Sequence, residues 1–222
     1  MEAFNASYHG VLEYEAKRWM YRLLEQPDDF CFSLEDMAAK VMCQLTWDDP
    51  SQSETLGTSA WGLLTQMSPA GPITNVLTPL WHLPFAINPW RKAEKIRHDT
   101  QTEWFRQRYA RTQQLHQHGL ARPCWTKQYL DIEKTRPLSG DIEAAAALGM
   151  LALVGVFTVA GPLYYFLLAM VYHPDWQVKV QQEIDEQCNG AMPTLADGPK
   201  LPTLRACIKE TMRWKPNVPT GK

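Results

Sequence analysis

The stretch that decides the fold reads AAAALGMLALVGVFTVAGPLYYFLLAMV and runs from Ala144 to Val171 without one charged side chain. It is long enough to cross a bilayer, because a membrane-spanning helix needs about 20 apolar residues. Three features argue against a span: the internal Pro162, the acidic Asp141 and Glu143 on one flank, and the lack of a Lys or Arg cluster close to the other flank. We therefore expect a long central helix that is apolar all round because it is buried.

Apolar spacing on both sides of this run predicts further helices and no strands. The expected helices lie near Leu12–Glu25, Ser33–Thr46, Ser53–Met67, Pro89–His118, Gly140–Tyr172, Asp175–Gln187 and Pro202–Trp214. Clusters of Pro, Gly and Asn separate them. The sequence therefore predicts an all-α fold, and we expect residues 1–222 to form a single domain.

Composition restricts the class of protein. The chain has 222 residues, of which 45% are hydrophobic and 21% charged, which suits one globular core. A net charge of −2 gives no overall positive field, so we expect no nucleic-acid partner. The five cysteines are scattered and never paired as Cys-x-x-Cys, which argues against a disulfide framework or a zinc cluster. The first residues lack the pattern of a signal peptide, so we expect no transmembrane anchor and a cytoplasmic location.

Two motifs follow the central run in order. His173-Pro174 stands directly after it, and Glu210-Thr-Met-Arg213 lies further on, with its acid and base one helical turn apart. In this order, the run and the two motifs resemble the cytochrome P450 family, especially its filamentous-fungal members. The resemblance implies a shortened member that keeps the helical core of the cytochrome P450 fold. It also implies that Glu210 and Arg213 are structural rather than catalytic residues.

The middle of the central run resembles the part of the family's long helix that carries a small residue, Gly, any residue, an acid and then Thr. Here the segment reads Val154-Gly155-Val156-Phe157-Thr158. Gly155 and Thr158 match, whereas Phe157 replaces the acid that, in the family, works with Thr to deliver protons to iron-bound oxygen. The proton relay implied by the resemblance therefore loses its ionisable member.

Helical spacing predicts one apolar face on this helix, and we expect that face to line a pocket. Gly155 fits either close helix packing or a bound ring, and Thr158 fits either a functional contact or a hydroxyl that bonds back to the previous turn. The apolar loop from Pro69 to Pro89 resembles the family's lid, although its aromatic side chains could equally pack on the helical body. The substrate-binding candidates are Trp81, Phe85, Leu151, Val154, Gly155, Phe157 and Pro162, and the catalytic candidates are Thr158 and Tyr165.

The family holds its haem iron through a cysteine in a loop after the Glu-x-x-Arg helix, and a haem propionate through an earlier segment with an arginine. The printed sequence stops at Lys222, and Met1 to Gly10 contains no Arg. The Cys188-Asn-Gly190 segment reproduces only the Cys-x-Gly ending of the cysteine loop. We therefore expect no haem, no metal and no other cofactor.

Three classes of function fit these features. The favoured one is a haem-free cyclase or isomerase, whose pocket would hold a hydrophobic terpenoid or polyketide-like intermediate in a reactive shape. The second is a non-catalytic partner or substrate-binding protein that pairs through apolar patches with a second copy or a full-length relative. The third is part of a haem-thiolate monooxygenase. In each case we expect a cytoplasmic location, with peripheral attachment to the endoplasmic reticulum as the alternative.

Overall fold

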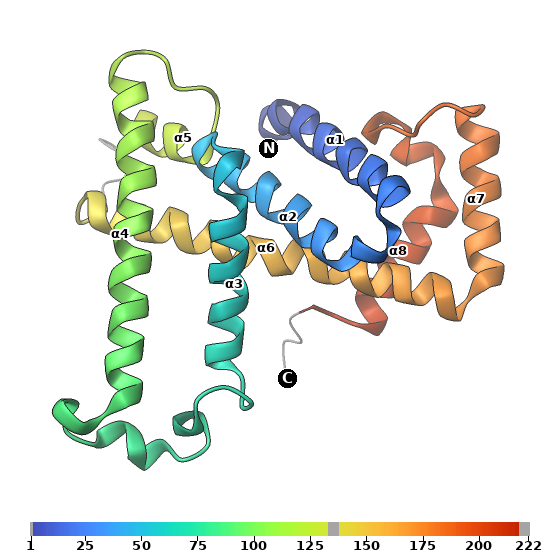
Figure 1. The fold of residues 1–222 in the computed structure, drawn as a ribbon. Helices are drawn as coiled ribbons and strands as arrows, with labels where there is room; N and C mark the ends of the chain where they lie inside the picture. The colour runs from blue at the N-terminus through green and yellow to red at the C-terminus, as the bar shows by residue number, and fades with distance from the viewer. Residues whose placement is uncertain (1, 133–137, 218–222) are drawn as a thin grey trace. The chain divides into compact units, whose positions relative to one another are not determined.

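In the computed structural model, which describes residues 2–132 and 138–217, with side chains from Tyr8 onward, every regular element of the described residues is a helix (Figure 1). The α-helices are α1 Glu2–Glu25, α2 Phe30–Trp47, α3 Ser53–Met67, α4 Pro89–Gln117, α5 Trp125–Ile132, α6 Asp141–Tyr172, α7 Pro174–Cys188 and α8 Pro202–Trp214. The shorter 3-10 turns are η1 Pro27–Asp29, η2 Pro50–Gln52, η3 Ile73–Asn75, η4 Thr78–His82, η5 Phe85–Ile87 and η6 Leu195–Lys200. The predicted all-α fold is confirmed.

Proline and asparagine set several of the helix boundaries. Helices α4, α7 and α8 begin with Pro89, Pro174 and Pro202, where the missing N–H costs nothing because the first turn has no partner for it. Helix α7 ends at Cys188 and is capped by Asn189, which adopts a left-handed conformation with φ of 50°, and Gly190 follows with φ of 77°. Residues at the boundaries themselves therefore determine where these helices begin and end.

The loop before α4 is ordered by Asn88, whose side chain is fully buried. Its Nδ2 donates to the carbonyl oxygens of Leu80 at 3.1 Å and Trp81 at 3.2 Å, and its Oδ1 accepts from the Arg91 N–H at 3.0 Å. One side chain thus caps α4 and satisfies two carbonyls of the turn that carries Trp81. The stretch that the sequence predicted as plain loop therefore contains 3-10 turns, and Asn88 fastens the one that carries Trp81.

The described residues group into two compact units, one made of residues 1–38 and 157–222 and the other of residues 39–156. Helices α2 and α6 each contribute one part to either unit. The family resemblance ran through both units, and the expectation of a single domain stays a prediction.

An aromatic cluster forms the core of the 39–156 unit. Trp47 is 1% exposed and meets Trp104 edge to face, with ring centroids 5.3 Å apart, while Phe105 lies 6.3 Å from Trp47. Close to this cluster, the carboxylate of the buried Asp49 accepts from Arg111 Nη1 at 2.7 Å. This charge-assisted bond fastens α4 to the turn that follows α2.

Two glycines of α6 let other helices of the same unit come close. A Cβ at Gly149 would overlap the ring of Phe105 on α4, and a Cβ at Gly155 would overlap the end of the Met42 side chain on α2. Both glycines therefore serve close helix packing, against a rigid ring at Gly149 and a flexible side chain at Gly155, and close packing is one of the two roles that the sequence left open for Gly155.

In the other unit, α6 is fastened to the start of α2 by Tyr164. Its hydroxyl donates to the carbonyl oxygen of Cys31 at 2.7 Å and lies 3.0 Å from Glu35 Oε1. Burial, followed by the hydrogen bond to the Glu35 carboxylate, raises the pKa of the Tyr164 phenol above its usual value of 10.0. The sequence named the neighbouring Tyr165 as the candidate and gave no sign of this contact.

Replacing Tyr164 with Phe should lower the free energy of unfolding by about 1 kcal/mol, because the hydrogen-bond donor is lost. The folded-state pKa lies above the unfolded value of 10.0, so the contribution is fully present below pH 10.0 and is lost as the pH rises further. Urea unfolding of wild type and Tyr164→Phe on both sides of pH 10.0 measures this, and the difference between them should shrink in alkali. The exposed Tyr14→Phe is the control; a constant difference at all pH values would contradict the linkage.

The two packing glycines make a matched pair of substitutions in one helix. Gly149→Ala should destabilise the protein by about 1–3 kcal/mol, because the buried Phe105 ring cannot move aside. Gly155→Ala should be close to neutral, because the flexible end of Met42 can rotate away and Ala gains about 1 kcal/mol of helix propensity. Thermal unfolding compares them, and equal effects would refute this description of the packing.

Candidate functional site

Helix α6 carries most of the predicted site residues, and two of them expose apolar surface. Leu151 is 52% exposed and Val154 is 39% exposed. The opposite side is buried at Ala152, Leu153, Val156 and Ala160. Leu151 and Val154 thus form a short exposed apolar stripe on α6, and apolar patches on protein surfaces are often binding surfaces.

By length and composition, α6 would also suffice to cross a membrane, and 39% of its most apolar 18-residue stretch is buried within the described residues. The sequence predicted a helix buried all round, and this holds on one side only, where Ala152, Leu153, Val156 and Ala160 pack against protein. The exposed stripe shows that this packing is incomplete on the other side.

The two units divide the predicted site. Leu151, Val154 and Gly155 belong to the 39–156 unit, together with Trp81 and Phe85, which are 40% and 45% exposed in the loop before α4. The remaining predicted residues belong to the other unit and are Phe157, Thr158, Pro162, Tyr165, Glu210 and Arg213. By helical spacing, Leu151, Val154 and Gly155 share one face within the first set, and Thr158 and Pro162 share one face within the second, whereas Phe157 points to a different side of α6.

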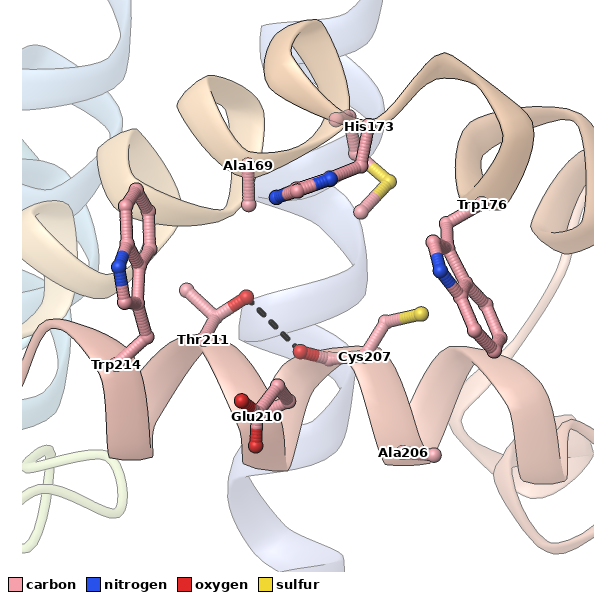
Figure 2. A pocket seen from close by; sticks show the side chains of 9 residues that line it. Ala169, His173, Trp176, Ala206, Cys207, Glu210, Thr211 and Trp214 are labelled. Atoms are coloured by element: carbon pink, nitrogen blue, oxygen red, sulfur yellow. Dashed lines mark hydrogen bonds between the residues drawn. The ribbon is translucent and has the colours of Figure 1, made fainter.

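A pocket that the sequence did not predict lies between the end of α6, the start of α7 and one face of α8 (Figure 2). Its volume is about 360 Å³, near the lower end of the usual range for small-molecule sites. Trp176 and Trp214 stand at opposite ends, and His173 lies across from Cys207 and Thr211. The full lining is Ala169, Met170, His173, Trp176, Ala206, Cys207, Glu210, Thr211 and Trp214.

Three polar side chains of this pocket, Thr211, Cys207 and Glu210, are engaged in hydrogen bonds or favour the neutral form. The Thr211 hydroxyl donates to the Cys207 carbonyl at 2.9 Å. Burial raises the pKa of the Cys207 thiol, which favours the neutral form over the nucleophilic thiolate. The Arg213 guanidinium donates to both oxygens of Glu210 at 2.6 and 2.8 Å, and these bonds hold the pKa of that carboxyl below its usual value. The pocket is therefore an apolar hollow without an activated nucleophile.

The sequence predicted an ion pair between Glu210 and Arg213, and the structure contains it. Both side chains are exposed, at 60% and 74%, so solvent screens the pair and it contributes little to stability by itself. Of all the predicted site residues, Glu210 alone also lines the pocket. In the sequence, this pocket is indicated only by two tryptophans in neighbouring helices, Trp176 in α7 and Trp214 in α8.

A haem of the cytochrome P450 type needs a thiolate ligand. The surroundings of the five cysteines therefore show whether the described residues could provide one. Cys43 and Cys124 are fully enclosed, and burial raises the pKa of Cys124. Cys207 favours its neutral form, while Cys31 stands on exposed surface and Cys188 is the last residue of α7. The described part of the chain also contains no cluster of His, Cys, Asp and Glu arranged to hold a metal ion. These residues do not build a thiolate haem site on their own.

Comparisons with known proteins agree with the fold. A family model described as Cytochrome P450 matches residues 19–222. The chain is 30% identical to Cytochrome P450 monooxygenase fogE of Aspergillus ruber, over 97% of this chain and 41% of that protein. It is 28% identical to Cytochrome P450 monooxygenase ple1 of Rhodocybe pseudopiperita, over 98% of this chain and 44% of that protein. The chain thus spans less than half the length of these relatives.

A solved structure described as a zebra fish cytochrome P450 with progesterone superposes with a TM-score of 0.68 and 21% identity, over 97% of this chain and 50% of that chain. At this identity the likeness supports the fold alone. It extends through both compact units, because it covers nearly the whole chain.

The expectation that the protein uses no haem is wrong. The family that matches this chain normally binds haem, and the matched relatives are cytochromes P450. The expectation rested on motifs missing from the printed sequence, and such an absence says nothing about a ligand supplied by other parts of the same fold.

The identity of the family rests on the extent of the match rather than on one motif. The matched region contains the Gly155 and Thr158 segment of α6 and the Glu210 and Arg213 pair of α8. Since the family model covers residues 19–222 of 222, this chain belongs to the cytochrome P450 family.

Proposed function

We propose that this chain forms the central helices of a fungal-type cytochrome P450 monooxygenase that oxidises a hydrophobic small molecule of secondary metabolism. The observation that supports this most is α6, which carries Gly155 and Thr158 beside an uncovered apolar stripe in a chain of this family. The rest of the family fold, in the same gene product or in a second chain, would supply the thiolate. The haem would supply oxygen activation, which no side chain can provide.

The chain's own residues would bind and orient the substrate. Leu151 and Val154 expose apolar surface on α6, and each Å² that a substrate covers contributes roughly 25 cal/mol. Trp81 and Phe85 expose aromatic surface in the same unit, in a loop whose backbone Asn88 fastens. We propose that this loop contributes the aromatic side of the substrate site, and that the substrate is therefore uncharged and largely apolar.

Proton transfer would depend on Thr158, because Phe157 provides no carboxylate. A threonine hydroxyl cannot titrate near neutral pH, so its role would be to hold a hydrogen bond at a fixed position rather than to act as an acid. This predicts that the hydroxyl, and not the methyl group, is the part of Thr158 that matters.

Other functions predicted from the sequence remain alternatives within this proposal. A cyclase or isomerase would use the same apolar surface to hold a flexible substrate, and its product would have the mass of its substrate. A partner protein would use the stripe to bind a second copy or a full-length relative. The monooxygenase differs from both because its product gains one oxygen atom.

The proposed location is the cytoplasmic side of the endoplasmic reticulum, since cytochromes P450 are often associated with that membrane. Helix α6 is the described segment that passes the length and composition test for a membrane span. Its buried stripe favours a place inside the folded protein instead, so we propose peripheral attachment through other parts of the molecule.

The test uses the full gene product that contains this chain. Its reduced, carbon monoxide-treated form should show a thiolate-type Soret band, and apolar substrates should yield products that contain one atom from labelled O₂. Thr158→Ala should lower kcat by about tenfold or more, and Thr158→Ser should retain most activity. Thr65→Ala in α3 is the control, because that hydroxyl bonds only to its own helix, at the carbonyl of Trp61. A folded product without the band, or products of unchanged mass, would refute the proposal.

A further inference from the structure

Asn217 lies three residues beyond the end of α8 and contacts α6. Its Nδ2 donates to the carbonyl oxygen of Phe157 at 3.1 Å, and the side chain is half-buried. Both residues belong to the same compact unit, although 60 positions separate them in the chain. The contact therefore ties the segment after α8 to the turn of α6 where the family carries its acid and threonine.

The amide fits into a space that one glycine leaves open. A Cβ placed on Gly161 would lie 2.7 Å from Asn217 Cγ and would overlap Asn217 Oδ1. Real Cβ atoms do not come so close to other atoms, so the contact requires glycine at position 161 or a displaced Asn217. Because it has no side chain, Gly161 lets the Asn217 amide come close to α6.

The next residue explains why α6 needs support at this turn. Pro162 has no N–H, so it cannot donate to the carbonyl of Thr158, and its ring pushes that carbonyl away. Helices bend and open at such a proline. The Asn217 amide adds a donor from outside the helix to the adjacent carbonyl, that of Phe157, and so restrains the opened turn.

We propose that Asn217 is a positioning residue, which holds the Phe157 carbonyl from the space beside Gly161 and thereby sets the place of the Thr158 hydroxyl. The restraint on α6 stands on the contacts described. Its consequence for turnover rests on the monooxygenase function proposed above, so the two are tested by separate measurements.

The first measurement is hydrogen exchange of the α6 segment 157–163, followed by mass spectrometry. Asn217→Ala should speed exchange there by about tenfold, because the outside donor is lost. Gly161→Ala should act similarly, because it displaces the amide. The double variant should be no worse than the more affected single variant, since both substitutions remove the same contact. The control is Gly62→Ala, in a helical glycine of α3 with open space around it, which should leave exchange in α6 unchanged.

The second measurement is steady-state turnover of the full gene product with an apolar substrate. Asn217→Asp keeps the shape of the side chain but removes the N–H donor, and it should lower kcat by about tenfold while KM stays unchanged. Unchanged exchange in Asn217→Ala, or additive effects in the double variant, would overturn the restraint. Faster exchange with unchanged kcat would overturn the positioning role. A parent protein without the thiolate-type band would refute the proposed function, whereas the exchange result would still decide the restraint.

Discussion

An apolar helix of 32 residues needs cover, and the packing of other elements against one side of α6 is the constraint on which the rest of the structure depends. Both compact units are built on α6, one on its first half and the other on its second half. Polar contacts also join the elements within each unit. In one unit, Tyr164 of α6 donates to the Cys31 carbonyl at the start of α2. In the other, Arg111 of α4 donates to the Asp49 carboxylate in the turn after α2.

Glycine and proline adjust α6 locally where helices must meet it closely. Gly149, Gly155 and Gly161 each make room for a different side chain, namely a rigid ring, a flexible thioether and an amide. The tolerance of each site differs accordingly, because a ring cannot yield whereas a thioether can. Pro162 adds an opened turn next to the third of them. A helix that reads as one uniform apolar run is therefore three distinct packing sites in a row.

Much of the fold could be predicted because helical periodicity and proline signals are local. The bounds of α3 and α8 were predicted to the residue, since apolar periodicity marks both helices and Pro202 marks the start of α8. Helix α5 was missed because eight residues give too short a pattern. The pocket of Cys207 and the Asn217 contact were missed for a different reason: each depends on elements that meet only after folding. The haem prediction failed because it inferred a property of the protein from motifs that the printed sequence lacks.

The turn at Phe157 also looks different in the sequence and in the structure, because a residue 60 positions away contacts it. In sequence, replacement of the family's acid by Phe157 reads as a loss of function, because an ionisable group is gone. In the structure, this turn gains a neutral amide from Asn217, bonded to the carbonyl of Phe157 rather than to its side chain. Phe157, Thr158 and Asn217 have no side chain that titrates between pH 5 and 8. If the chain has the proposed monooxygenase function, this turn would use fixed hydrogen bonds where the family uses a charge, and its geometry should matter more than its protonation.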